Sequence, residues 1–461
     1  MKIALITFGN EESYGLLFVG GELLRFGQEI RYFDTENEKV EKEVVDWKPD
    51  FIFFSPMTTF FPKAIRISRE IKTILPKVIS VFGGHHATAC AKISELDEVD
   101  VVVLGPVRGS IEEILGGQKG IIKTVPTTPD DLSMPARKEY YRDIPRMANR
   151  YRVIMLSMLG CPWNCSYCSS SSSHIRNIHG AAAHLQYFLS RRPIPVIIAE
   201  AKEVLKYGRP FEIEWVDDDI FSGLDVESWI PEFVAAWDKH IGLPMYVSTT
   251  SVNVLKVSDN VLARLKKIVN CVGMGIQAIR PESLKLFNRS WDSETKMKAS
   301  YDRLKSFGYA VNLQCIIGLP VNDPVEDALD TIKGLQRIGP GSICSCYPLM
   351  IYPGTAMEKY CMERGISLNE ACTEDTNSAT PHISFSPKIT KRLRNICKLT
   401  TLFVKHNISE KWMRALVDID FDDATSRELS TVRYFECIRD RLKSKGEEIF
   451  NEIIRSTKLR Y

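Results

Sequence analysis

The chain has 461 residues, of which 44% are hydrophobic and 26% charged, and its formal net charge is +2. This length predicts two or three domains with an ordinary globular composition. The near-zero charge offers no electrostatic case for nucleic acid as the main partner. No apolar run reaches the roughly eighteen residues that a membrane helix needs.

The N-terminal residues Met1–Phe8 are apolar, but they run into Gly9-Asn10-Glu11-Glu12 without a small-residue cleavage site. We therefore expect a first strand rather than a signal peptide. The twelve cysteines are mostly scattered and indicate no oxidising compartment. A cytoplasmic protein is expected.

The first 125 residues alternate apolar runs with amphipathic segments. The expected strands are Lys2–Phe8, Glu29–Phe33, Phe51–Phe54, Val78–Phe82 and Val101–Leu104, and the expected helices are Tyr14–Phe26, Val40–Trp47 and Lys63–Leu75. Buried strands joined by helices predict a parallel sheet covered on both faces. Ligands of such sheets bind beyond the carboxyl ends of the strands. The loops there are Gly9–Gly15, Ser55–Phe61, Gly83–Thr88 and Gly105–Ser110.

One of these loops carries a family resemblance. Gly83-Gly84-His85-His86-Ala87-Thr88 resembles the Gly-Gly-x-His-Ala-Thr loop of the cobalamin-binding domain in class B radical S-adenosylmethionine (SAM) enzymes. The resemblance implies a Rossmann-like, doubly wound domain over residues 1–125. The cobalamin contacts that it implies are Gly9, Ser13, Tyr14, Gly15, Ser55, Met57, Thr58, Thr59, Gly83, Gly84, His85 and Gly105.

The resemblance also implies how cobalt is held. The chain lacks the Asp-x-His-x-x-Gly motif that supplies a histidine to cobalt in other cobalamin proteins, so we expect base-off cobalamin above the loop Ser55–Phe61. Phe60 or Phe61 would supply a flat apolar surface there. Relatives usually carry Gly-Glu-Gly-Glu where this chain has Gly105-Pro106-Val107-Arg108-Gly109. A flavodoxin-like domain without ligand, or one that docks a partner, stays open as the alternative.

Residues 126–150 are rich in turn formers and predict a linker. They resemble the Leu-x-x-Leu-Pro-x-Pro-Ala-Arg segment that joins the two domains of class B relatives. From residue 151 to residue 355 strands and helices alternate again. The expected strands are Val153–Ser157, Glu212–Val216, Met245–Thr249, Val272–Ile276, Ala310–Ile317 and Ser342–Leu349. Six such units agree with the partial (β/α)6 TIM-type barrel of the radical SAM superfamily, with chemistry at the carboxyl ends of its strands.

Three thiols follow the first of these strands within eight residues, in Gly160-Cys161-Pro162-Trp163-Asn164-Cys165-Ser166-Tyr167-Cys168. Three cysteines can hold three irons of a [4Fe–4S] cluster and leave the fourth iron open for chemistry. The spacing resembles the radical SAM motif, which implies Cys161, Cys165 and Cys168 as cluster ligands and Tyr167 against the adenine of SAM. A zinc site that borrows a fourth cysteine is the alternative.

Later strand ends complete the expected SAM site. Asp217-Asp218-Asp219-Ile220-Phe221 resembles the Asp-Asp-x-Phe form of the motif that accepts hydrogen bonds from the SAM amino group. Gly273–Ala278 resembles Gly-Ile-Glu-Ser, Ile316–Pro320 resembles the glycine turn beside adenine, and Tyr352–Thr355 resembles the close of the barrel. The SAM contacts implied are Asp217, Asp218, Thr249, Gln277, Gln314 and Gly318.

Residues 356–461 show helical periodicity at Lys391–Phe403 and Val432–Ser456 and predict a helical domain that caps the substrate pocket. The segment Ser169–Arg192 leaves the cluster loop directly. It is either a cover over the active site or a flexible surface loop, and the sequence does not decide between them.

The function expected from the resemblance is a cobalamin-dependent radical SAM methyltransferase. A 5′-deoxyadenosyl radical would abstract hydrogen from an unactivated carbon, which then takes a methyl group from methylcobalamin. An electron donor such as ferredoxin or flavodoxin would supply electrons to the cluster. The substrate would be a small molecule or a peptide or protein side chain. The alternatives are a radical SAM cyclase or rearrangement enzyme, and a non-catalytic iron–sulfur or zinc protein that binds a partner.

Overall fold

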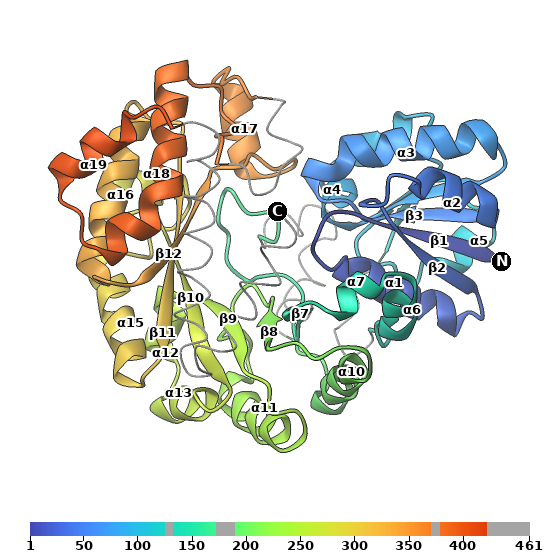
Figure 1. Ribbon diagram of the computed structural model, residues 1–461, viewed down its shortest axis with the longest axis horizontal. Coiled ribbons are helices and arrows are strands. Elements are labelled where there is room, and N and C mark those ends of the chain that lie inside the picture. The colour runs from blue at the N-terminus through green and yellow to red at the C-terminus, as the bar shows by residue number, and fades with distance from the viewer. Residues whose placement is uncertain (125–131, 172–189, 370–378, 422–461) are drawn as a thin grey trace.

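The computed structural model describes residues 1–124, 132–171, 190–369 and 379–421. It contains two six-stranded sheets, each built of parallel strands, and the two sheets lie side by side (Figure 1). The N-terminal sheet has the order β2-β1-β3-β4-β5-β6, and the second has the order β12-β11-β10-β9-β8-β7 and curls into a half-barrel. The predicted α/β fold class is confirmed: a Rossmann-like domain, a partial barrel and a mainly helical C-terminal region.

The N-terminal sheet consists of β1 (Lys2–Thr7), β2 (Glu29–Asp34), β3 (Phe51–Phe54), β4 (Ile79–Phe82), β5 (Val101–Leu104) and β6 (Gly120–Lys123). The strand β6 was not predicted. Only Ile122 of its four residues is buried, so this edge strand lacks the continuous apolar run of a central strand. The Gly83–Thr88 segment was predicted as a loop, but Gly84–Ala89 forms the short helix α4.

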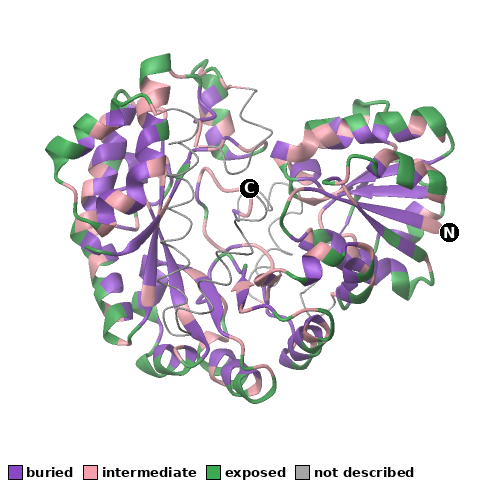
Figure 2. Cartoon of the chain, in the orientation of Figure 1, coloured by how far each residue is buried: buried purple, intermediate pink, exposed green. Residues whose placement is uncertain are grey.

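Helices cover both faces of this sheet, and the strands between them are buried (Figure 2). The face with α1 (Tyr14–Arg25) and α5 (Ile111–Leu115) belongs to a core that continues into the barrel. The opposite face packs against α2 (Val40–Trp47) and α3 (Phe61–Ile74), and its core contains residues of the N-terminal domain only. One face of the Rossmann-like sheet is therefore packed toward the barrel.

The segment between the sheets contains more structure than a linker of turn formers predicts. Helix α6 (Arg137–Asp143) packs against β2 and against α10 (Ile194–Tyr207) of the barrel, and α7 (Pro145–Ala148) follows it. The side chain of Arg137 is fully buried. Sequence composition alone did not reveal these helices, because their stability comes from contacts with two distant elements.

The half-barrel consists of β7 (Arg152–Met155), β8 (Glu212–Trp215), β9 (Met245–Thr250), β10 (Val269–Gln277), β11 (Ala310–Ile317) and β12 (Ile343–Pro348). Each predicted strand is present with its ends shifted by no more than a few residues. The helices on its outer side are α10, α11 (Val226–His240), α12 (Ser251–Lys256), α13 (Asp259–Leu265), α14 (Pro281–Leu286), α15 (Glu294–Ser306) and α16 (Pro324–Ile338).

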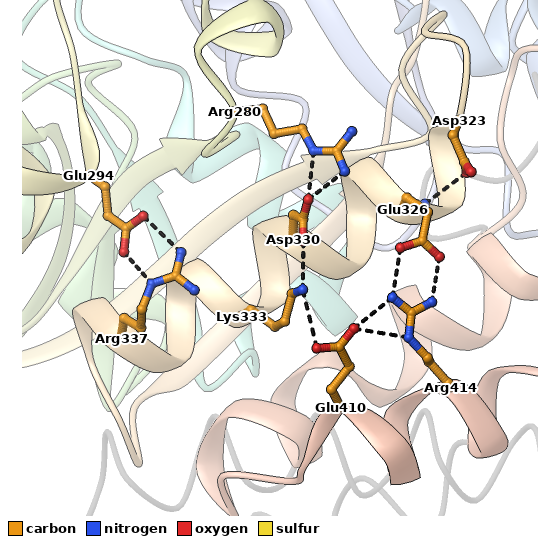
Figure 3. Close-up of polar contacts among 9 residues, drawn as sticks. All are labelled: Arg280, Glu294, Asp323, Glu326, Asp330, Lys333, Arg337, Glu410 and Arg414. Carbon is orange, nitrogen blue, oxygen red and sulfur yellow. Dashed lines mark hydrogen bonds and ion pairs between the residues drawn. The ribbon is translucent and has the colours of Figure 1, made fainter.

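The described C-terminal part is helical, with α17 (Ala356–Glu363), α18 (Pro387–Lys405) and α19 (Glu410–Val417). Helix α18 packs against β12 and α16 and contains the predicted helix Lys391–Phe403. The predicted helix Val432–Ser456 lies outside the described residues. Figure 3 shows how α19 is attached to α16: Arg414 of α19 pairs with Glu326 of α16 at 2.5 Å, and Glu410 of α19 pairs with Lys333 of α16 at 3.4 Å. Within the described ranges, no helix is both long and apolar enough for a membrane span.

Candidate cofactor site between the two sheets

A cavity of about 520 Å³ lies between the N-terminal domain and the half-barrel. Its walls come from the loops after β1, β3, β4 and β5 on one side and from the segments after β7 and β8 on the other. The lining residues that the sequence predicted as cobalamin contacts are Ser13, Tyr14, Gly15, Ser55, Met57, Gly83, Gly84, His85 and Gly105. The barrel contributes Leu156, Met158, Leu159, Gly160, Ser169, Ser170, Val216 and Asp218. The structure thus brings the predicted cobalamin loops and the start of the cluster loop to one cavity.

The other predicted cobalamin contacts, Gly9, Thr58 and Thr59, lie outside the cavity lining. Gly9 does not line the cavity. Its φ of +70°, and the 2.8 Å that would separate a Cβ there from the Phe60 ring, show that it makes room for that ring. Phe60 lines the cavity and stacks on Phe8 with ring centroids 5.9 Å apart. Of the two phenylalanines proposed as an apolar surface, Phe60 is the one that faces the cavity.

Thr58, Phe61 and His86 pack together outside the cavity wall. The Phe61 ring lies 4.1 Å from the His86 ring, and His86 Nδ1 lies 3.2 Å from Thr58 Oγ1. Burial lowers the pKa of His86 to about 4, so its imidazole is neutral at physiological pH. Thr59 is buried and also does not line the cavity. The neighbouring His85 lines the cavity, so the paired histidines have different environments.

The cluster loop is fastened to the barrel through its backbone. Ser166 N donates to Phe287 O at 3.1 Å, and Met357 N of α17 donates to Ser166 O at 2.8 Å. Cys161 and Cys165 are buried, while Cys168 is half-buried. Tyr167 stacks edge-on against Phe287, with ring centroids 4.6 Å apart. These contacts hold the three thiols on one loop at the end of β7.

Several groups around this loop fit an iron–sulfur cluster. Burial and the nearby Asp218 raise the pKa of the Cys168 thiol to about 12, so a bound metal is needed to hold it as a thiolate. The buried Trp163 Nε1 and Arg289 Nε have no hydrogen-bond partner in the described part of the chain, and cluster sulfurs accept such bonds. Among the described residues no three histidine, cysteine or acidic side chains are grouped closely enough for a single metal ion.

The three consecutive aspartates have different environments. Asp217 is fully buried and accepts hydrogen bonds from Ser157 N at 2.7 Å and Trp215 Nε1 at 2.9 Å. Asp219 accepts from backbone and side-chain donors of Thr250 and from Thr249 Oγ1. Asp218 alone of the three lines the cavity, and its side chain is exposed there. Partial desolvation between the two domains, together with the charge of Asp217, raises its pKa to about 7. Of the two predicted carboxylates, Asp218 is the one that is available to a ligand.

The other predicted SAM contacts lie along neighbouring strands of the barrel and do not line this cavity. Gln314 donates to the Tyr246 hydroxyl at 2.9 Å. Gln277 has a positive φ of 69° at a β-bulge that ends β10, and Gly318 has a φ of 74° after β11. The hydroxyl of Thr249 is bonded to Asp219 at 2.8 Å. Their contacts with SAM stay predictions.

Sequence reasoning missed a buried ionic network beside the cavity. Arg137 donates to Glu12 at 2.8 Å and to Glu200 at 2.9 Å, and Arg192 donates to Glu200 at 2.8 Å. The Tyr14 hydroxyl donates to Glu200 at 3.0 Å. Burial alone would raise the pKa of Glu200, but the charges of Arg192 and Arg137 lower it. The members are far apart in the sequence, and no local pattern marks them.

Comparisons with known proteins match both halves of the chain. A family model described as the B12 binding domain matches residues 3–115, and one described as the radical SAM superfamily matches residues 155–333. The chain belongs to the cobalamin-dependent radical SAM family. The cofactors of this family are cobalamin, a [4Fe–4S] cluster and SAM, as the sequence predicted. The departure at Pro106-Val107-Arg108 therefore lies within a domain that the B12 family model still matches.

Two curated relatives of this cobalamin-dependent radical SAM protein are named as methylases or methyltransferases. Hopanoid C-3 methylase from Methylococcus capsulatus is 28% identical over 190 residues, which are 34% of this chain and 36% of that protein. The match thus spans about a third of that relative's length. An uncharacterised methyltransferase from Pyrococcus horikoshii is 22% identical over 373 residues, which are 73% of this chain and 74% of that protein.

Solved structures share the fold of both domains. The radical SAM methyltransferase TsrM from Kitasatospora setae, solved with cobalamin and a [4Fe–4S] cluster bound, has a TM-score of 0.58 at 14% identity and covers 80% of each chain. The cobalamin-dependent SAM radical enzyme OxsB has a TM-score of 0.61 at 11% identity, covering 100% of this chain and 75% of its own. At these identities the agreement concerns the fold.

Proposed function

We propose that the protein is a radical SAM C-methyltransferase that moves a methyl group carried by cobalamin to an unactivated carbon. The observation that carries this proposal is the shared cavity. Loops at the carboxyl ends of the Rossmann-like sheet and the cluster loop of the barrel face the same space. A methyl carrier on one side and a radical source on the other are then close enough to act on one substrate.

The residues have separate roles in this proposal. When bound, the cofactors supply one-electron cleavage of SAM and a methyl group on cobalt. Cys161, Cys165 and Cys168 hold the cluster, and Asp218 accepts from the SAM ammonium, since a carboxylate suits a cation. Phe60 gives the corrin an apolar floor. The curated relatives named as methyltransferases support the activity.

We also propose that cobalamin binds base-off and without a protein nitrogen on cobalt. Phe60 lies in the cavity wall, while His86 is held against Phe61 and Thr58 outside it. The electron paramagnetic resonance spectrum of the Co(II) state should therefore lack splitting from an axial nitrogen. A triplet splitting would contradict this proposal and would implicate His85 or the base of the cofactor.

The decisive experiment counts cofactors and products on anaerobically purified protein. Four irons and one corrinoid per chain are expected, together with 5′-deoxyadenosine and S-adenosylhomocysteine from SAM under reducing conditions. The matched control replaces Cys161, Cys165 and Cys168 by Ala, which should abolish iron absorbance and deoxyadenosine while keeping bound corrinoid. Iron without corrinoid would overturn the methyltransferase proposal in favour of another radical SAM reaction.

The domain limits of this proposal follow the two sheets. We assign cobalamin binding to residues 1–125, the joining segment to residues 126–150, the barrel to residues 151–355 and the capping region to residues 356–461. We also assign the protein to the cytoplasm, where cysteines that bind a cluster stay reduced.

A further inference from the structure

The cluster loop has a second side that does not face the cavity. Trp163, between the first two cysteines, stacks on Trp291 with ring centroids 4.4 Å apart and an angle of 28° between the rings. Both indoles are half-buried, and neither lines the cavity. The cluster loop thus begins at the cavity, at Gly160, and carries a stacked aromatic pair that does not line the cavity.

Cations surround this pair, which with its two exposed lysines we call the tryptophan patch (Trp163, Trp291, Lys256 and Lys296). Lys256 Nζ lies 5.2 Å from the centroid of the Trp163 ring, and Lys296 Nζ donates to Trp291 O at 2.6 Å. Both lysines are exposed, and neither forms an ion pair with a carboxylate of the described residues. The patch therefore presents apolar rings and unpaired positive charge together.

The acidic residues that could neutralise the patch are engaged elsewhere. Asp292, next to Trp291, is buried and bonds to Arg289 at 3.1 Å. Glu294 pairs with Arg337 at 2.5 Å (Figure 3). An aromatic centre with a cationic rim, whose neighbours Asp292 and Glu294 are already engaged, is complementary to an acidic protein surface.

The patch is also in contact with a cluster ligand. The Arg289 guanidinium lies 4.5 Å from the Trp291 ring and donates from Nη1 to Cys165 Sγ at 3.7 Å. Trp163 itself belongs to the cluster loop. These contacts make a short, continuously packed route from the surface to the thiolates that does not cross the cavity.

We propose that the tryptophan patch is the docking surface of an acidic one-electron carrier protein, and that electrons enter the cluster there. The donor loses one electron and the cluster gains it, with no bond formed and no proton moved. This inference rests on the proposed function, since it assumes a bound cluster that must be reduced. Separating electron entry from the cavity leaves the cavity free for cofactors and substrate.

The test uses the holoenzyme, reduced plant-type [2Fe–2S] ferredoxin as the probe, and the double variant Lys256→Glu/Lys296→Glu. We expect the Kd for ferredoxin to rise about tenfold or more at low ionic strength, and the difference to vanish near about 0.5 M salt, where surface charges are screened. Stopped-flow reduction of the cluster absorbance by ferredoxin should slow in parallel. Reduction by dithionite, which needs no docking surface, should keep its rate.

The matched control is Lys42→Glu on α2, an exposed lysine on the N-terminal domain. It should leave ferredoxin affinity and reduction rate unchanged. Unchanged ferredoxin affinity in the double variant would overturn the inference, and so would an equal loss of rate with dithionite, because the lysines would then act on the cluster itself. A protein that holds four irons and cleaves SAM with dithionite but ignores ferredoxin would refute only this inference, whereas a protein without iron would refute the proposed function.

Discussion

At the scale of single residues, three identical neighbours have three different roles. Asp217, Asp218 and Asp219 follow one strand, yet only Asp218 reaches the cavity. Asp217 accepts a hydrogen bond from Ser157 N and Asp219 accepts one from Thr250 N, so buried donors hold both of these carboxylates away from the cavity. A motif of adjacent carboxylates therefore does not distinguish a ligand from a structural support.

The two aspartates provide a matched pair of variants. Asp218→Asn should weaken SAM binding by about 1.5–3 kcal/mol, the scale of a hydrogen bond to a charged group, while the free energy of unfolding stays unchanged. Asp217→Asn should instead lower the free energy of unfolding by roughly 3–5 kcal/mol, because Arg191 would lose its buried carboxylate and keep only the exposed Asp225. Isothermal titration with SAM and urea unfolding measure the two effects. The assignment fails if Asp217→Asn affects only SAM binding.

The buried His86 should make stability depend on pH. Its folded pKa of about 4 lies below the ordinary value of 6.5, so between these values the unfolded chain binds a proton that the folded chain excludes. Above pH 6.5 both states are neutral and the penalty is absent. As pH falls from 7 to 5, protonation of His86 in the unfolded chain should therefore lower the free energy of unfolding by about 2 kcal/mol.

Urea unfolding at the two pH values tests this linkage. His86→Gln should remove that part of the pH dependence, whereas His240→Gln, an exposed histidine at the end of α11, should not. An identical pH dependence in wild type and His86→Gln would show that His86 does not keep its low pKa in solution.

At the scale of elements, the C-terminal helices are held to the barrel by a packed layer and a rim of ion pairs. Helix α18 buries Leu393, Ile396 and Phe403 in the main core. Helix α19 adds Met413 and Val417 to that core, and its Arg414 and Glu410 form exposed pairs with α16 (Figure 3). Burial should therefore contribute most of the stabilisation, because exposed pairs are screened by water and salt.

Two substitutions in α19 compare these contributions. Arg414→Met removes its pairs with Glu326 and Glu410 and should lower the Tm only slightly, with a smaller effect at high salt. Met413→Ala leaves a cavity in the core and should cost about 2–5 kcal/mol at any salt concentration. Thermal unfolding in low and high salt separates the two. If Arg414→Met lowered the stability more than Met413→Ala, the ion pairs rather than the core contacts would hold α19 in place.

At the scale of the whole molecule, the cavity depends on how the two sheets are placed. The network of Glu12, Arg137 and Glu200 joins the N-terminal domain, the joining segment and the barrel in one buried cluster. Arg137 also donates to Ile154 O of β7 at 2.5 Å. Because Glu12 also lines the cavity, we expect this network to hold the two walls at their distance.

Breaking this network should affect the whole chain. Arg137→Gln leaves the buried Glu12 without its cation and Glu200 with Arg192 alone, and it should cost roughly 3–5 kcal/mol of unfolding free energy. Small-angle scattering should show a larger radius of gyration as the domains separate. The control Arg142→Gln changes an exposed arginine on the same helix and should leave both readouts near those of the wild type. If the two variants had the same unfolding free energy and the same radius of gyration, the network would not be what holds the two domains together.

Much of this protein could be predicted from its sequence. Buried strands, amphipathic helices and the three-cysteine loop are local patterns, since their spacing reflects backbone geometry within a few residues. The barrel strands, the Rossmann-like sheet and the cofactors were accordingly predicted. The edge strand β6 and the helices α6 and α7 were not, because neighbours far away in the chain stabilise them.

Only the tertiary structure decided which predicted residues meet. It placed Asp218 and Phe60 in the cavity wall, whereas Asp217 bonds to Ser157 and Phe61 packs against His86 outside the cavity. It also assembled the Arg137 network and the tryptophan patch from segments more than a hundred residues apart. The sequence specifies the type of each residue, whereas the direction and burial of its side chain depend on packing against distant elements. Direction and burial in turn determine whether a polar group binds a ligand or another group of the protein.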